Sequence, residues 1–197
     1  MSLDEFQEQT LVLIKPDGVK RGLTGKILAR FEEAGLKIVA LKMVQASRQF
    51  VENHYPNTPE WIRGMGQKTL GSYRNEGKDP FEEVGTDDPM AIGEMIKQWN
   101  IDYLTSGPIV AVVLQGVHAI NVVRKMCGNT IPFNAEPGTI RGDFSTASPI
   151  IANALKTSIK NLIHAAGNPQ EAKHEIRHWF PESDFCDYRR TDEVVMF

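Results

Sequence analysis

The 197-residue sequence has few of the features that mark secreted, membrane-spanning or nucleic-acid-binding proteins. It has only two cysteines, Cys127 and Cys186, far apart and outside any CxxC pair, which argues against a disulfide framework or a zinc knuckle. Its longest aliphatic run, residues 109–114, is too short to span a bilayer. A net charge of -3 argues against general nucleic-acid binding as the main role. Residues 1–9 lack a secretory pattern, so we expect a soluble, cytoplasmic protein with reduced thiols.

Two common phosphate-binding motifs are also missing. Gly25-Lys26 is followed by Ile27 rather than serine or threonine, and Lys20 stands where a Walker A motif needs glycine. No GxGxxG sequence is present. Any nucleotide must therefore be held by another arrangement.

One metal-binding motif is present, in residues 174–178. His174-Glu175-Ile176-Arg177-His178 matches HExxH, in which two histidines on one helix face bind zinc and the glutamate acts as base. Only a short tail follows His178, which leaves little room for a third ligand. We favour two surface histidines on an amphipathic helix.

The hydrophobic pattern alternates between strands and helices. It predicts strands at 10–14, 36–45, 108–116 and 162–163, and helices at 25–33, 47–55, 117–127, 148–160 and 169–180. Thr24 and Ser47 are the expected helix caps, and 129–144 is expected to be an ordered loop. The order predicts an α/β sandwich with one sheet covered by helices.

Six segments in order resemble the nucleoside diphosphate kinase family: TLVLIKPDGVKRGLTGKIL, RFEEAGLKIVALKM, TSGPIVAVVLQG, VVRKMCGNT, EPGTIRGDF and NLIH. The resemblance implies a ferredoxin-like sandwich with a four-stranded antiparallel sheet. It also implies one domain over 1–197, with a helical insertion at about 56–103 and a shorter one at about 145–158. The implied activity is transfer of the γ-phosphate of a nucleoside triphosphate, typically ATP, to a nucleoside diphosphate through a phosphohistidine, in a ping-pong cycle.

The resemblance assigns that phosphohistidine to His164, in the Asn161–His164 segment. Glu175 falls at the family distance for the glutamate that orients the ring, and Tyr55 is expected near the histidine. The transferring group needs fixed cations. The residues expected to bind the nucleotide phosphates and sugar are Lys15, Arg124, Thr130, Arg141 and Asn161. No protein ligand for a metal is expected, because Mg²⁺ would be held mainly by the nucleotide phosphates and water.

This chain departs from the family pattern after the histidine. Ala165-Ala166-Gly167-Asn168 replaces the usual Gly-Ser-Asp, so the serine that supports the glutamate and ring is missing. A catalytically weak nucleotide-binding relative is therefore the rival reading. The base-stacking aromatic lies in the altered region, where Trp61, Phe81 and Trp99 are candidates. The resemblance also implies a homohexamer or another closed homo-oligomer.

The insertion carries apolar residues at helical spacing. Trp61, Ile62 and Met65 suit one helix face, and Ile92, Met95, Ile96 and Trp99 suit another. We expect two short helices that pack on the core or on a neighbouring subunit. A mobile lid over the nucleotide is the alternative.

Overall fold

The computed structural model describes residues 6–193, which form two compact units. The sheet unit comprises residues 6–45, 108–146 and 161–193. The helical unit comprises residues 46–107 and 147–160. Among the described residues, no helix is both long enough and apolar enough to cross a membrane.

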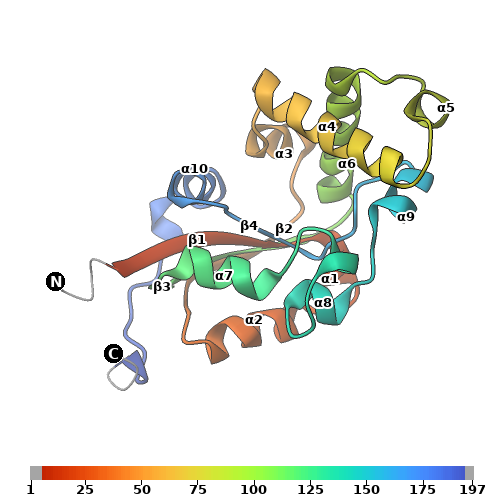
Figure 1. Cartoon of the computed structure of the whole chain (residues 1–197). Coiled ribbons are helices and arrows are strands. Elements are labelled where there is room, and N and C mark those ends of the chain that lie inside the picture. Colours follow the sequence, from red (N-terminus) through yellow and green to blue (C-terminus); the bar gives the residue numbers. More distant parts are fainter. Residues whose placement is uncertain (1–5, 194–197) are drawn as a thin grey trace. The chain divides into compact units, whose positions relative to one another are not determined.

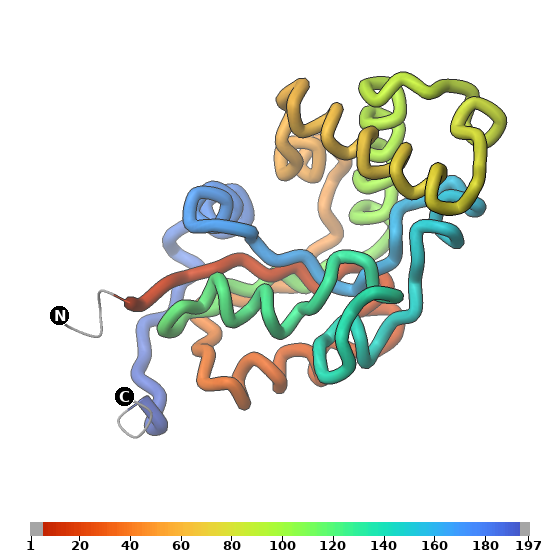
Figure 2. Tube along the Cα trace, viewed as in Figure 1, coloured from red at the N-terminus to blue at the C-terminus, as the bar shows by residue number. Residues whose placement is uncertain are grey.

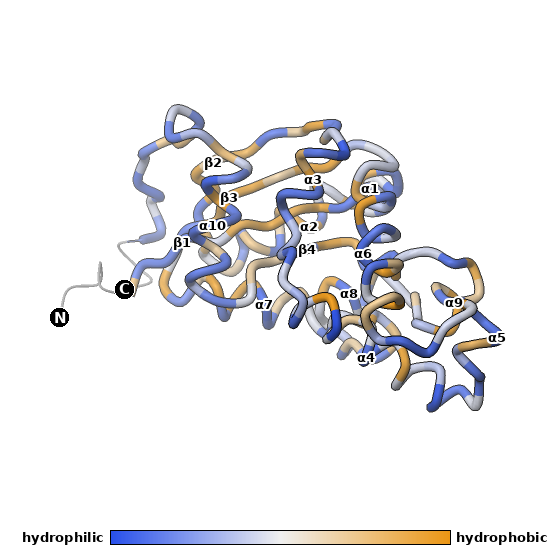
Figure 3. Tube along the Cα trace, turned by 90° about the horizontal axis from the view of Figure 1, so that it is seen from above, coloured by the Kyte–Doolittle hydropathy of each residue, from blue (hydrophilic) through white to orange (hydrophobic). Residues whose placement is uncertain are grey.

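The sheet unit is built on four antiparallel strands in the order β2-β3-β1-β4 (Figure 1). Their bounds are β1 Gln7–Ile14, β2 Lys37–Val44, β3 Ile109–Val117 and β4 Ile163–Ala165. The two central strands are the most apolar, and Figure 3 shows them largely in the hydrophobic colours. Leu11–Ile14 of β1 and Ile109–Leu114 of β3 are buried, because each central strand is covered on both faces. The predicted four-stranded antiparallel α/β sandwich is confirmed.

Helices cover both faces of this sheet. Helices α2 (Thr24–Glu33) and α7 (Ala119–Cys127) lie on one face, and α10 (Pro169–Trp179) lies on the other (Figures 1 and 2). The core on the first face joins Val12 and Ile14 with Phe31 and Val123. The short elements of this unit are α1 (Pro16–Lys20), α8 (Ile140–Phe144) and the 3₁₀ turns η2 (Pro132–Asn134) and η3 (Glu182–Asp184).

Several local predictions need correction. Residues 129–144 contain η2 and α8 rather than only a loop, and Thr139 caps α8 by accepting the Gly142 N–H. Thr24 is the first residue of α2 rather than its cap; Leu23 holds the cap position without a side-chain bond. The helix predicted for 148–160 ends at Ala154, and the chain soon reaches a left-handed φ of 48° at Lys156.

The helical unit contains α3 (Arg48–His54), α4 (Pro59–Asn75), α5 (Pro80–Val84), α6 (Pro89–Thr105) and α9 (Pro149–Ala154). Ser47 caps α3 as predicted. The two helices predicted for the insertion are present, and both are longer than expected. They cross at glycines: a Cβ on Gly93 would lie 2.0 Å from the Ile62 carbonyl oxygen, and one on Gly66 would lie 1.8 Å from that of Pro89. Only glycine permits so close an approach.

Candidate active site

The segment before His164 is fixed by bonds to the end of β1. The Lys15 N–H donates to the Leu162 carbonyl at 2.8 Å, and the Leu162 N–H donates to the Asp17 carboxylate at 3.2 Å. Leu162 is fully buried and has a left-handed φ of 68°, which a leucine rarely adopts. Its surroundings impose this strained conformation, and strain of this kind gathers at functional sites. The backbone therefore enters β4 at a set angle and places His164 at the centre of that short strand.

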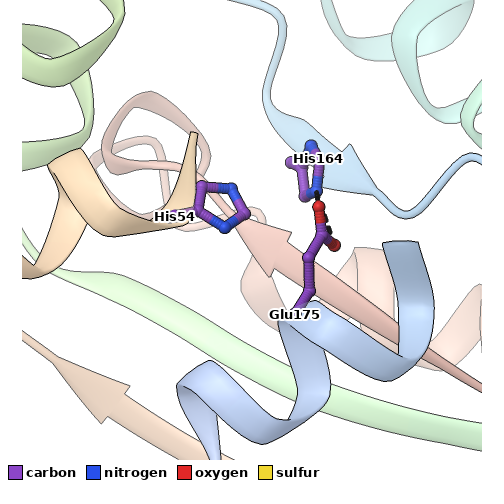
Figure 4. Close-up of side chains that lie close together, drawn as sticks. All are labelled: His54, His164 and Glu175. Carbon is purple, nitrogen blue, oxygen red and sulfur yellow. Dashed lines mark hydrogen bonds and ion pairs between the residues drawn. The ribbon is translucent and has the colours of Figure 1, made fainter. Parts of the chain in front are cut away.

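Glu175 holds the imidazole ring of His164. Both carboxylate oxygens lie 2.9 Å from Nε2, and Figure 4 shows the carboxylate reaching from α10 to the ring on β4. Glu175 is buried because it shares the sheet-facing stripe of α10 with Ala172 and Trp179. Because an ionised carboxylate can only accept a hydrogen bond, this contact assigns the ring proton of His164 to Nε2. The other nitrogen, Nδ1, then keeps its lone pair.

The ring stays neutral in this environment. Burial lowers the pKa of His164 to about 3, and the positive charges of Lys15 and Arg141 add to this effect. A neutral ring near pH 7 is the form that attacks phosphorus, because protonation would occupy the lone pair.

A small polar cavity of about 200 Å³ opens beside His164 within the sheet unit. It brings together five predicted phosphate and sugar contacts with the histidine: Lys15, Arg124, Thr130, Arg141 and Asn161. Lys15 directly follows β1, Arg124 lies in α7 and Thr130 lies just after it. Arg141 lies in α8, and Asn161 lies just before β4. Residues distant in sequence thus form one cationic pocket, as phosphoryl groups require.

The three cations of the pocket differ in their bonding. The Lys15 ammonium donates to Asn161 Oδ1 at 2.7 Å, and burial lowers its pKa to about 7, helped by Arg141 and opposed by Asp17. The Arg124 side chain is exposed, and its guanidinium makes no hydrogen bond to any described residue. Its guanidinium is therefore available to a ligand.

Arg141 is a buried crosslink as well as a pocket cation. Its guanidinium donates to the carbonyls of Asn161 at 3.1 Å, Gly128 at 2.8 Å and Ile163 at 2.7 Å. It therefore ties the end of α7 to both sides of the strained Leu162. The prediction from sequence had considered only its charge.

Sequence analysis did not assign Glu171, Cys127 or Gly128 to the site, and these residues also line the cavity. Gly128 has φ 78°, and a Cβ there would lie 2.3 Å from the Thr139 hydroxyl, so the turn needs glycine. The available signal for Glu171 was the Asn168-x-x-Glu171 pattern, a helix-capping sequence.

Tyr55 and the three aromatic candidates for base stacking belong to the helical unit. Tyr55 stacks on Trp61, with ring centroids 5.9 Å apart. Its closeness to the histidine, and the choice among Trp61, Phe81 and Trp99, remain predictions.

The HExxH sequence has a different use here. Glu175 points to His164, while His174 is exposed and His178 packs edge-on against Trp179. Within residues 6–193, neither His174 nor His178 belongs to a cluster of three potential metal ligands. The expectation that this motif holds no metal stays a prediction.

Known proteins share both the sequence and this architecture. Residues 8–61 and 94–185 match the family model of nucleoside diphosphate kinase. Between these two stretches lie residues 62–93, which belong to the insertion. A nucleoside diphosphate kinase of Pyrobaculum aerophilum is 52% identical over 180 residues, which cover 91% of this chain and 98% of that protein.

Solved structures agree. A crystal structure of the NDP kinase from Pyrobaculum aerophilum superposes with a TM-score of 0.90 at 49% identity, covering 92% of this chain and 100% of that one. A transition-state mimic of the Borrelia burgdorferi enzyme with vanadate and ADP gives 0.77 at 34% identity, covering 97% of each chain. The combination of matched sequence, fold and a histidine-centred cationic pocket leads to one conclusion: this chain belongs to the nucleoside diphosphate kinase family.

Proposed function

We propose that His164 is the nucleophile of a ping-pong phosphoryl transfer in this chain. The observation that carries the proposal is the Glu175 contact, which leaves a neutral ring with its Nδ1 lone pair beside three cations. The lone pair attacks the γ-phosphorus of a triphosphate, and the bond from that phosphorus to the β–γ bridging oxygen breaks. Its electron pair leaves with the diphosphate, and no proton leaves the ring. A second diphosphate then reverses the step with its terminal oxygen.

The pocket residues take separate roles in this proposal. Arg124 and Lys15 bind the phosphate oxygens, and the Arg124 guanidinium suits a bidentate contact. Thr130 offers a hydroxyl to a phosphate, while Asn161 and Lys15 reach the sugar hydroxyls. Arg141 adds charge and holds the pocket walls together. Family resemblance assigns Tyr55 to the site as well, and this assignment stays a prediction.

We further propose that Mg²⁺ arrives with the nucleotide. The pocket's donor set is mainly cationic, and its one carboxylate, Glu171, already accepts two hydrogen bonds, so the residues do not form a cage for a hard cation. They fit an ion carried on phosphate oxygens, which would supply neutralisation of charge on the departing diphosphate.

The proposed substrates are ATP and other triphosphates, with nucleoside diphosphates as acceptors. The Borrelia burgdorferi structure holds ADP, and a Halobacterium salinarum family member of 28% identity holds CDP. Two different bases among these proteins support weak base selection here. The pocket residues address phosphate and sugar, so we expect kcat/KM to vary little among bases. A preference of several orders of magnitude would contradict this.

Histidine variants test the nucleophile. Incubation with γ-labelled ATP should label the chain with phosphate that survives alkali and is lost in acid. His164→Ala should lose labelling and turnover, while His118→Ala and His174→Ala keep most of both. His118 occupies the N-cap position of α7 without a capping side-chain bond and packs on Phe6, and His174 is exposed. Turnover in purified His164→Ala, or an unlabelled wild type, would favour the catalytically weak relative.

A closed homo-oligomer in the cytoplasm is also proposed, from family membership. Light scattering after size exclusion measures the subunit number. In the insertion, we propose that α4 and α6 pack on the core or on a neighbouring subunit. Replacing 64–89 with a short linker should then reduce assembly or stability while turnover per folded subunit is kept. A sharply raised KM with unchanged size would favour a lid.

A further inference from the structure

Glu171 closes a reciprocal cap at the start of α10. Its N–H donates to the Asn168 Oδ1 at 2.9 Å, as in a capping box. Its carboxylate reaches back and accepts the Gly167 N–H at 2.7 Å and the Asn168 side-chain amide at 2.8 Å. The Glu171 side chain therefore helps to hold the turn that leads from His164 into α10, together with the Ala166 N–H, which donates to the Leu11 carbonyl at 3.3 Å.

The same carboxylate also lines the phosphate pocket. A Cβ added to Gly167 would lie 2.8 Å from Glu171 Oε2 and 3.5 Å from Arg124 Nη1. The Glu171 carboxylate and the Arg124 guanidinium thus both lie next to the place that a Gly167 side chain would occupy. Glu171 is the only acidic residue among those that line this cavity.

Its charge acts on the histidine. Lys15, Arg141 and Arg124 all lower the pKa of His164, whereas Glu171 raises it. A charge that favours an imidazolium disfavours an anion on the same ring. Because no proton leaves the ring, phosphorylation of Nδ1 adds about one net negative charge to the pocket. Glu171 would therefore repel it, while the three cations attract it.

We propose that Glu171 is a positioning residue that holds the turn after His164 and whose negative charge destabilises the phosphohistidine, so that the phosphoryl group passes on to a diphosphate. The inference rests on His164 being the nucleophile. In a pocket with three cations and no acid, the phosphorylated ring would be a low-energy state from which transfer is slow. The carboxylate offsets part of that stabilisation and brings the two half-reactions closer to balance.

The phosphoenzyme equilibrium tests the role of the charge. The full-length protein is incubated with labelled ATP at several ADP concentrations, and the labelled fraction gives the equilibrium constant. Glu171→Gln keeps an acceptor for the Gly167 N–H and removes the charge. We expect a shift toward phosphoenzyme of roughly fivefold to tenfold, the order of magnitude of one screened interaction between two charges, with slower single-turnover transfer to ADP. Glu182→Gln makes the same charge change outside the pocket and should leave the constant unchanged.

A second variant separates charge from capping. Glu171→Asp keeps the charge but shortens the reach to Gly167, so it should lower thermal stability and leave the equilibrium near that of wild type. An equal shift in Glu171→Asp and Glu171→Gln would overturn the proposal, as would a constant within twofold of wild type in Glu171→Gln. Failure of the wild type to be labelled would instead refute the proposed function itself.

Discussion

Replacing Arg141 with lysine should destabilise the sheet unit although the charge is kept. Three carbonyls now accept from one planar guanidinium, and Arg141 is only 7% exposed. A lysine ammonium on a flexible stem cannot reach all three, so one or two buried carbonyls lose their donor. Each hydrogen bond to a charged group contributes about 1.5–3 kcal/mol, so we expect a loss of ~3 kcal/mol. That is a large part of the stability of an ordinary domain.

Because the chain forms two compact units, the spectroscopic probe of unfolding should report on the sheet unit. Trp179 lies in that unit, and Trp61 and Trp99 lie in the other. Urea unfolding followed by Trp179 fluorescence, in a chain with both other tryptophans changed to phenylalanine, measures the relevant free energy. Arg124→Lys is the matched control, because the Arg124 guanidinium makes no hydrogen bond to the described residues. It should change stability by less than ~0.5 kcal/mol and weaken nucleotide binding. Equal stability of Arg141→Lys and Arg124→Lys would refute the crosslink.

Three further predictions concern the helical unit and the titration of the pocket. Gly93→Ala should destabilise the helical unit by more than ~3 kcal/mol, because the added Cβ would lie 2.0 Å from the Ile62 carbonyl oxygen. Gly71→Ala is the control, because a Cβ there would have no atom within 4 Å, and it should stabilise α4 by up to ~1 kcal/mol. Urea unfolding followed by Trp99 fluorescence compares the stability of the two variants. Because burial lowers the pKa of His164 to about 3, its ring should stay neutral from pH 8 to about 4.5, and an NMR titration with a midpoint near 6.5 would contradict this. Because the pKa of Lys15 is lowered to about 7, the free enzyme loses the positive charge of Lys15 as pH rises through 7, and kcat/KM should fall above that pH. If a Lys15→Arg variant shows the same alkaline decline in kcat/KM, Lys15 is not its cause.

The sequence alone predicted the fold class, and it proposed the histidine and five of the other residues that line the pocket. Leu11–Ile14 and Ile109–Leu114 are short, continuous apolar runs of the kind that buried central strands have, and the helices between them follow from apolar spacing. Ordered motifs assigned His164, Glu175 and the cationic residues. Short-range signals worked least well where tertiary contacts decide. Residues 129–144 read as a loop, yet Arg30 and Arg21 bind Asp143 and the Phe144 carbonyl and help hold α8 in place.

Only the tertiary structure decided how these residues act. Hydrogen bonds that join residues distant in sequence cannot be read from spacing, so the crosslinking role of Arg141 was not predicted. The same holds for which ring nitrogen of His164 keeps its lone pair, since that depends on where the Glu175 carboxylate reaches from α10. The depressed pKa of His164 requires burial and converging charges, which are properties of a folded pocket. The sequence names the groups, and their distances in the fold set their chemistry.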